Sequence, residues 1–144
     1  MTSYRVVRRK HADLSGEGAR LYGGRFNPPG VPAVYTSRSI ALALLEVMVH
    51  LDRVEVPTDY VVMAFSFAGK SVSRPRSGMA GARHLTPAEF TAAFRHRPIV
   101  RVASVIVPRE FNYVFFPAVS GFRASVDWIE PLEFDGRLFA SLGI

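Results

Sequence analysis

Hydrophobic residues fall into short alternating runs and two longer blocks, which predicts strands mixed with a few helices. Alternation, together with β-branched and aromatic content, is typical of strands. These signals predict strands over residues 4–8, 33–36, 60–68, 99–107, 113–116 and 124–129. Regular strand–helix alternation is missing, so the order favours an α+β domain with a small mixed sheet over a doubly wound fold.

The two longer blocks predict helices. From Ile40 to Val49 every residue except Glu46 is apolar, and Ser37 or Ser39 can cap a helix that runs to residue 51 and is largely buried on all sides. Thr86-Pro87-Ala88-Glu89 forms a capping box with proline at the first helical position, which predicts a short helix over 87–96.

The remaining segments read as turns. Residues 15–30 are rich in glycine, and residues 69–82 are rich in Ser, Gly, Arg and Pro. Neither segment is a long linker, and the chain shows no internal repeat. We therefore expect one domain over residues 1–144.

Composition narrows the class of protein. The chain has 144 residues, of which 49% are hydrophobic and 21% charged, as in compact globular domains. It contains no cysteine, which excludes disulfides and thiolate metal sites. No apolar run suits a secretory signal or a membrane helix. These features predict a cytoplasmic protein without a membrane partner.

The formal charge of +6 favours anionic partners but does not select one. Most basic residues are scattered. The clustered ones, Arg8-Arg9-Lys10 and a looser group between residues 74 and 97, lack interleaved aromatic residues that stack on bases. Direct nucleic-acid binding therefore has little support. A basic nucleic-acid-binding module or RNase-type toxin remains the alternative function, and its binding would weaken at high salt.

Familiar catalytic motifs are missing. The segment Leu21-Tyr22-Gly23-Gly24-Arg25 lacks the spacing of a dinucleotide-binding loop, and no Walker or Ser hydrolase motif occurs. The histidines do not have a metal-ligand spacing with carboxylates, so no metal is expected. They are His11, His50, His84 and His96.

Three residues remain as candidates for chemistry. Glu46 carries a carboxylate into apolar surroundings, where it needs a partner. Pairing with Arg53 at the helix end, or exposure of the side chain to solvent, would explain this carboxylate as well as a functional role would. Arg25 follows two glycines that allow an unusual backbone path, and arginine suits phosphate or carboxylate. Tyr35 offers a ring and a hydroxyl, although by itself it is an ordinary strand aromatic.

The pattern of several segments resembles the RES-domain family, bacterial toxins named for an Arg, a Glu and a Ser. The resemblance covers nearly the whole chain and is most specific in its first third. By position, the Arg is Arg25, the Glu is Glu46, and the Ser is Ser104, with Asn112 as a further family feature. The segments that carry it are 16–30, 34–37, 43–47, 101–108, 110–113 and 134–138.

The resemblance implies a fold similar to ADP-ribosyltransferases of the diphtheria-toxin kind, with NAD⁺ as substrate. The nicotinamide–ribose bond would break through an oxocarbenium-like state that a carboxylate can stabilise. Glu46 would take this role, and Arg25 would hold the pyrophosphate or a ribose hydroxyl. Tyr35 would stack on the nicotinamide end or bond the ribose, and Ser104 would contact the nicotinamide side or position the loop.

The resemblance also implies a protein partner, an antitoxin of the Xre-linked kind that blocks the NAD⁺ site. The acceptor of ADP-ribose stays open between a target protein, water and phosphate. A catalytically silent domain that binds an antitoxin but leaves NAD⁺ intact is a further alternative.

Overall fold

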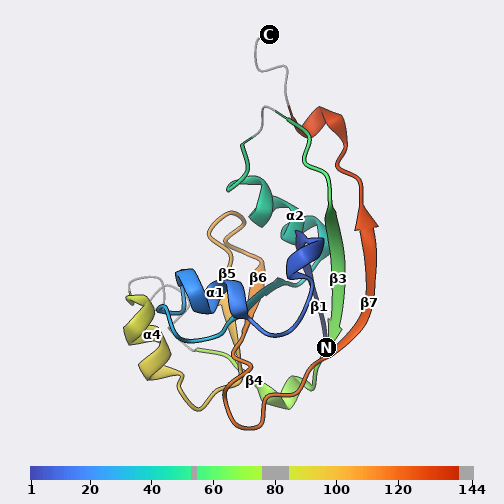
Figure 1. Ribbon diagram of the computed structural model, residues 1–144. Coiled ribbons are helices and arrows are strands. Elements are labelled where there is room, and N and C mark those ends of the chain that lie inside the picture. Colours follow the sequence, from blue (N-terminus) through green and yellow to red (C-terminus); the bar gives the residue numbers. More distant parts are fainter. Residues whose placement is uncertain (53–54, 76–84, 140–144) are drawn as a thin grey trace.

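The computed structural model describes residues 1–52, 55–75 and 85–139, and it is an α+β fold built on one mixed sheet (Figure 1). Seven strands follow the order β4-β5-β6-β2-β1-β3-β7. Their bounds are Thr2–Arg8 for β1, Val34–Ser37 for β2, Tyr60–Ser66 for β3, Val72–Ser73 for β4, Ile99–Ala103 for β5, Phe111–Phe115 for β6 and Ser125–Leu132 for β7.

The sheet is mixed because β4 pairs with β5 in parallel whereas the other neighbours are antiparallel. The longest uninterrupted register joins β1 to β3, from Thr2 opposite Ser66 to Arg8 opposite Tyr60. This arrangement confirms the predicted α+β class and the predicted strand at each of the six positions.

The described residues contain three α-helices, α1 (Glu17–Tyr22), α2 (Ile40–Met48) and α4 (Pro87–Ala93). Short 3₁₀ turns cover Arg9–His11, Gly69–Ser71 and Gly136–Leu138. In Figure 1, α1 and α4 lie beside β5 and β6, and α2 lies beside β1 and β3. Among the described residues, no helix is both long and apolar enough to cross a membrane.

Alternating side chains give the sheet two apolar faces. One face carries two clusters, the first built around Phe90, Val100 and Val114, and the second around Val6 and Met48. The opposite face carries a third cluster, which includes Val34, Met63, Phe65 and Phe115. The first two clusters lie under the helices, and they fix the face on which the candidate site forms.

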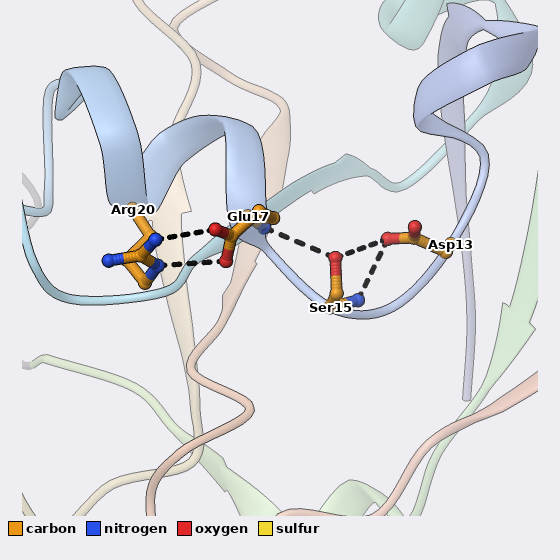
Figure 2. Close-up of polar contacts among 4 residues, drawn as sticks. All are labelled: Asp13, Ser15, Glu17 and Arg20. Carbon is orange, nitrogen blue, oxygen red and sulfur yellow. Dashed lines mark hydrogen bonds and ion pairs between the residues drawn. The ribbon is translucent and has the colours of Figure 1, made fainter.

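The helix α1 was not predicted, because its segment is rich in glycine. Local polar contacts stabilise it (Figure 2). Asp13 Oδ1 accepts hydrogen bonds from the backbone N–H and hydroxyl of Ser15, and Ser15 Oγ accepts the N–H of Glu17. The Glu17 carboxylate then pairs with Arg20 one turn along the helix. This i,i+3 pair compensates for weak helix propensity.

Two further predictions were wrong in detail. The strand predicted over 99–107 ends at Ala103, because the next residues form a turn around Ser104. The second helix is not buried on all sides: Leu45 is 42% exposed and Val49 58% exposed. It packs against β1 and β2 on its inner side only. Of the loop predicted over 69–82, residues 76–82 lie outside the described residues, and the rest contains a 3₁₀ turn and β4.

Candidate active site

Glu46 lies on α2, whose first turn is capped by the hydroxyl of Ser39, which accepts the N–H of Leu42 at 3.1 Å. The Glu46 side chain is half-buried. Its Oε1 accepts two hydrogen bonds, from Ser104 Oγ at 2.7 Å and from Asn112 Nδ2 at 2.6 Å. A helix, a turn and a strand thus meet at one carboxylate oxygen.

The turn that follows β5 fixes the direction of the Ser104 hydroxyl. Ser104 is fully buried, and its oxygen accepts the backbone N–H groups of Ile106 at 3.1 Å and Val107 at 3.0 Å. Because the oxygen is already an acceptor for both amides, its single hydrogen is left to donate to Glu46. This turn orients the carboxylate without adding a charge.

Asn112 completes the set from β6, where it pairs with Ser37 on one side and Val102 on the other. Its amide nitrogen donates to Glu46, while its Oδ1 is buried and has no hydrogen-bond partner among the described residues. A buried polar oxygen without a donor is unfavourable. It is therefore an acceptor that a ligand hydroxyl or amide could satisfy.

Hydrogen bonds from neutral groups, not a cation, accommodate the half-buried Glu46 carboxylate among the described residues. The donors to its carboxylate are neutral, and no described residue donates to the second oxygen, Oε2. Arg53, the alternative partner considered from the sequence, lies outside the described residues. The carboxylate is thus held in one orientation with one oxygen available to a ligand.

Arg25 lies at the tip of a four-residue turn. Gly24 and Asn27 form an antiparallel bridge that closes this turn, with the N–H of Gly24 donating to the carbonyl of Asn27 at 2.9 Å. Gly23 precedes it with φ of +73°, a conformation that favours glycine, and also ends α1. The Arg25 side chain is exposed, lies 5.7 Å from the ring centre of Phe26, and pairs with no carboxylate of the described residues.

Tyr35 supports this turn from β2. Its hydroxyl donates to Asn27 Oδ1 at 2.5 Å and accepts the N–H of Phe26 at 3.0 Å. Its ring stacks on Phe26 with centroids 6.3 Å apart. Burial raises the pKa of Tyr35 to about 12, so the hydroxyl is protonated at neutral pH.

The predicted residues therefore form two groups on the same face of the sheet. Ser104 and Asn112 each contact Glu46 directly, whereas Arg25 belongs to the neighbouring turn and Tyr35 supports that turn from β2. Register links the groups, because Ser37 is opposite Asn112 and Tyr35 is opposite Val114. Two residues along a strand correspond to about 7 Å, so the anchoring strands bring the groups close together.

A hollow of about 480 Å³ borders the Arg25 turn, between the end of α1 and the start of α4. Its lining residues are Tyr22, Gly23, Gly24, Asn27, Pro28, Pro29, Thr86, Pro87 and Ala88. A second hollow of about 620 Å³ lies between the end of β3 and the start of β7 and contains none of the predicted site residues. The first hollow adjoins the candidate site only through the Arg25 turn, because Gly24 and Asn27 line it whereas Arg25, Tyr35, Glu46, Ser104 and Asn112 do not.

Asn27 is the site residue that the sequence did not reveal. It is completely buried, and its amide donates to the carbonyls of Ala19 at 2.8 Å and Val31 at 2.9 Å. An asparagine between an aromatic residue and two prolines is a turn signal, and turn chemistry alone does not distinguish it from a surface residue. No group of three or more His, Asp or Glu residues suited to a metal occurs within the described part of the chain.

Comparison with known proteins shows which family this chain resembles. The model of the RES domain family matches residues 2–135. Toxin Res of Photorhabdus laumondii subsp. laumondii is 31% identical over 151 residues, which cover 96% of this chain and 97% of that protein. Prs ADP-ribosylating toxin of Sphingobium sp. is 33% identical over 125 residues, which cover 74% of this chain and 73% of that protein.

A shorter sequence match is to a protein that is named for a different activity. NAD(+) phosphorylase MbcT of Mycobacterium tuberculosis is 47% identical over 47 residues, or 32% of this chain and 25% of that protein. The crystal structure of the M. tuberculosis MbcT–MbcA toxin–antitoxin complex matches with a TM-score of 0.64 and 22% identity, covering 92% of this chain and 84% of that one. At that identity the likeness establishes the fold.

Proposed function

Because the chain belongs to the RES domain family, we propose that it is the toxin of a toxin–antitoxin pair and that it breaks the nicotinamide–ribose bond of NAD⁺. The observation that carries this proposal is the Glu46 carboxylate, fixed by the hydroxyl of Ser104 and the amide of Asn112 on one oxygen. Relatives named ADP-ribosylating toxin and NAD(+) phosphorylase support NAD⁺ as the substrate.

The chemistry follows from the orientation of Glu46. Loss of nicotinamide leaves positive charge on the ribose ring, and a fixed carboxylate stabilises that charge more than it stabilises neutral ground-state ribose. Two neutral donors hold the carboxylate in place without cancelling its charge, as a cation would. Oε2 is then free to face the ribose or to accept a proton from its hydroxyls or from the acceptor.

Arg25 suits the anionic part of the substrate. Its side chain is exposed at the tip of a closed turn, and the preceding Gly23 and Gly24 line the hollow beside that turn. Glycines allow a phosphate to approach the backbone, and an arginine can bind it through two parallel hydrogen bonds. We assign Arg25 to the pyrophosphate, and the buried Oδ1 of Asn112 to a hydroxyl or to the nicotinamide amide.

Transfer of ADP-ribose to a protein is our first choice of reaction, because the sequence match to the relative named ADP-ribosylating toxin covers 74% of the chain, against 32% for the phosphorylase. Transfer to water or phosphate, which depletes NAD⁺, is the second.

A protein antitoxin is the expected partner, and its proposed place is over the Glu46 site. Leu45 on the outer side of α2 and Val49 just after the helix are exposed, and the turn after β5 exposes Val105. Exposed apolar side chains in one region are typical of a surface that another protein covers. A partner seated there would close access to Glu46, and membership of the Xre family is the expectation for it.

One experiment tests the reaction and the acceptor together. Purified protein is incubated with NAD⁺ labelled in the adenylate part, with and without inorganic phosphate and cell lysate. Free nicotinamide with a labelled protein band indicates transfer to protein, whereas free nicotinamide with ADP-ribose or its phosphate indicates depletion. Intact NAD⁺ under all conditions would refute the proposal and favour the RNase-type or the silent binding alternative.

A further inference from the structure

We infer that Tyr35 and Asn27 act as a clamp that positions Arg25, and that the Tyr35 hydroxyl does not contact the substrate. The inference rests on the proposed NAD⁺ reaction, and it differs from the role that family resemblance predicted for Tyr35. Both side chains are therefore positioning residues.

Asn27 ties three segments together. Its Oδ1 accepts from the hydroxyl of Tyr35, and its amide nitrogen donates to the carbonyl of Ala19 in α1 and to that of Val31 beyond the turn. The residue is 0% exposed, so these contacts replace water completely. A side chain that satisfies two carbonyls and one hydroxyl inside the protein fixes the base of the turn.

The Tyr35 hydroxyl is committed to the same turn. Its hydrogen is donated to Asn27 and its oxygen accepts the N–H of Phe26. A Cβ added at Gly24 would lie 2.6 Å from this oxygen and 2.8 Å from Asn27 Oδ1. Backbone thus closes the side of the hydroxyl that faces Gly24, and a ribose hydroxyl cannot enter there.

Arg25 is consequently fixed at its backbone and free at its side chain. The N–H of Gly24 before it donates to the carbonyl of Asn27, and the N–H of Phe26 after it donates to Tyr35. Its exposed guanidinium forms no ion pair with the described residues. Fixing the backbone that carries a cation removes the backbone part of the entropic cost of binding an anion, and the side-chain part is paid when the anion binds.

Binding and turnover of NAD⁺ separate a positioning role from a direct contact. We expect Tyr35→Phe to raise the Kd and KM for NAD⁺ about fivefold to twentyfold while kcat changes less than about twofold. In an Arg25→Ala background, the same change should have no further effect on Kd, because the clamp acts through Arg25. A tenfold fall in kcat at constant KM, or losses in Kd that multiply in the double variant, would overturn the inference.

Tyr60→Phe is the matched control. Tyr60 is 7% exposed, and its ring packs edge-on against Phe134, in a different cluster from the clamp. No hydrogen bond of its hydroxyl occurs among the described residues. Its removal should leave Kd, KM and kcat within about twofold of their original values. A loss equal to that of Tyr35→Phe would mean that removing a tyrosine hydroxyl outside the clamp weakens binding as much, and would refute the clamp.

Amide hydrogen exchange provides a readout without NAD⁺. Tyr35→Phe should lower the protection of the Phe26 N–H by at least about tenfold and leave the N–H groups of Ile106 and Val107 unchanged, because those donate to Ser104. Unchanged protection at Phe26 would refute the clamp. If the wild-type chain did not consume NAD⁺ but the protection fell as expected, the proposed reaction would fail while the clamp stood.

Discussion

The hydroxyl of Ser104 donates a hydrogen bond to Oε1 of Glu46 at 2.7 Å, although 58 residues separate the two in sequence. Removing that hydroxyl by Ser104→Ala leaves the carboxylate held by Asn112 alone and leaves the amides of Ile106 and Val107 without their acceptor. We expect kcat for NAD⁺ cleavage to fall roughly tenfold to a hundredfold and the free energy of unfolding to fall by about 1 kcal/mol. Steady-state kinetics and urea unfolding measure the two effects.

Ser3→Ala is the control for that variant. Ser3 is also fully buried, but its hydroxyl has no hydrogen-bond partner among the described residues. Replacing it removes a polar group that burial leaves unsatisfied, so stability should stay equal or rise, and the reaction should not change. Equal losses in both variants would show that Ser104 matters only as a buried serine.

The cap of α2 supports the helix that carries Glu46. Ser39→Ala removes the acceptor for the N–H of Leu42, which should lower the free energy of unfolding by about 1 kcal/mol. Ser39→Asp, which keeps an acceptor and adds a charge that the helix N-terminus favours, should retain stability. Thermal unfolding compares the three proteins. Equal midpoints for Ser39→Ala and wild type would contradict the capping role.

Tyr35 should make stability depend on pH in the alkaline range. Burial raises its pKa to about 12, from about 10 in the unfolded chain, so the folded state holds this proton more tightly. The stability from the protonated hydroxyl is fully present below pH 10 and is lost as the pH rises towards 12. This contribution of Tyr35 to the free energy of unfolding is at most about 2–3 kcal/mol.

Tyrosinate absorbance followed against pH measures this effect. Tyr35→Phe should remove one late-titrating tyrosine from the curve and reduce the slope of unfolding free energy between pH 10 and 12. An identical slope in the variant would show that other groups cause the alkaline instability.

The strand pattern was largely predictable from the sequence, whereas the exposed surface was not, and the roles of the candidate site residues stay a prediction. Alternation located the strands because burial on the sheet faces requires it, and the capping box predicted α4, where both of its hydrogen bonds form. The turn after Ala103 was missed because Ser104 interrupts the strand through its own side chain, in a run that is otherwise apolar.

Long-range contacts explain the remaining differences between the prediction from the sequence and the structure. The apolar content of α2 predicted complete burial, yet a helix at the surface of a small sheet has only one side to bury, and Leu45 is exposed. The role of Asn27 depends on carbonyls that the fold brings together from both sides of it. Sequence spacing cannot show either relationship.

The exposed side of α2 leads us to predict where the antitoxin binds. Leu45→Lys places a charge on a side chain that is 42% exposed next to Glu46, so it should weaken neutralisation by the antitoxin without changing NAD⁺ cleavage. Growth of cells that co-express toxin and antitoxin measures neutralisation. Val126→Lys, at a residue 38% exposed on β7, is the control and should leave neutralisation intact. Normal growth with Leu45→Lys would place the antitoxin elsewhere.

The most direct test of the central claim is release of nicotinamide from NAD⁺ by purified Glu46→Gln. Glutamine keeps an oxygen that can accept from Ser104 and Asn112, so the fold should persist while the negative charge is lost. We expect a fall in kcat of at least about a hundredfold, against an unchanged rate for Glu133→Gln at an exposed carboxylate. A rate for Glu46→Gln equal to that of the wild-type protein would contradict it.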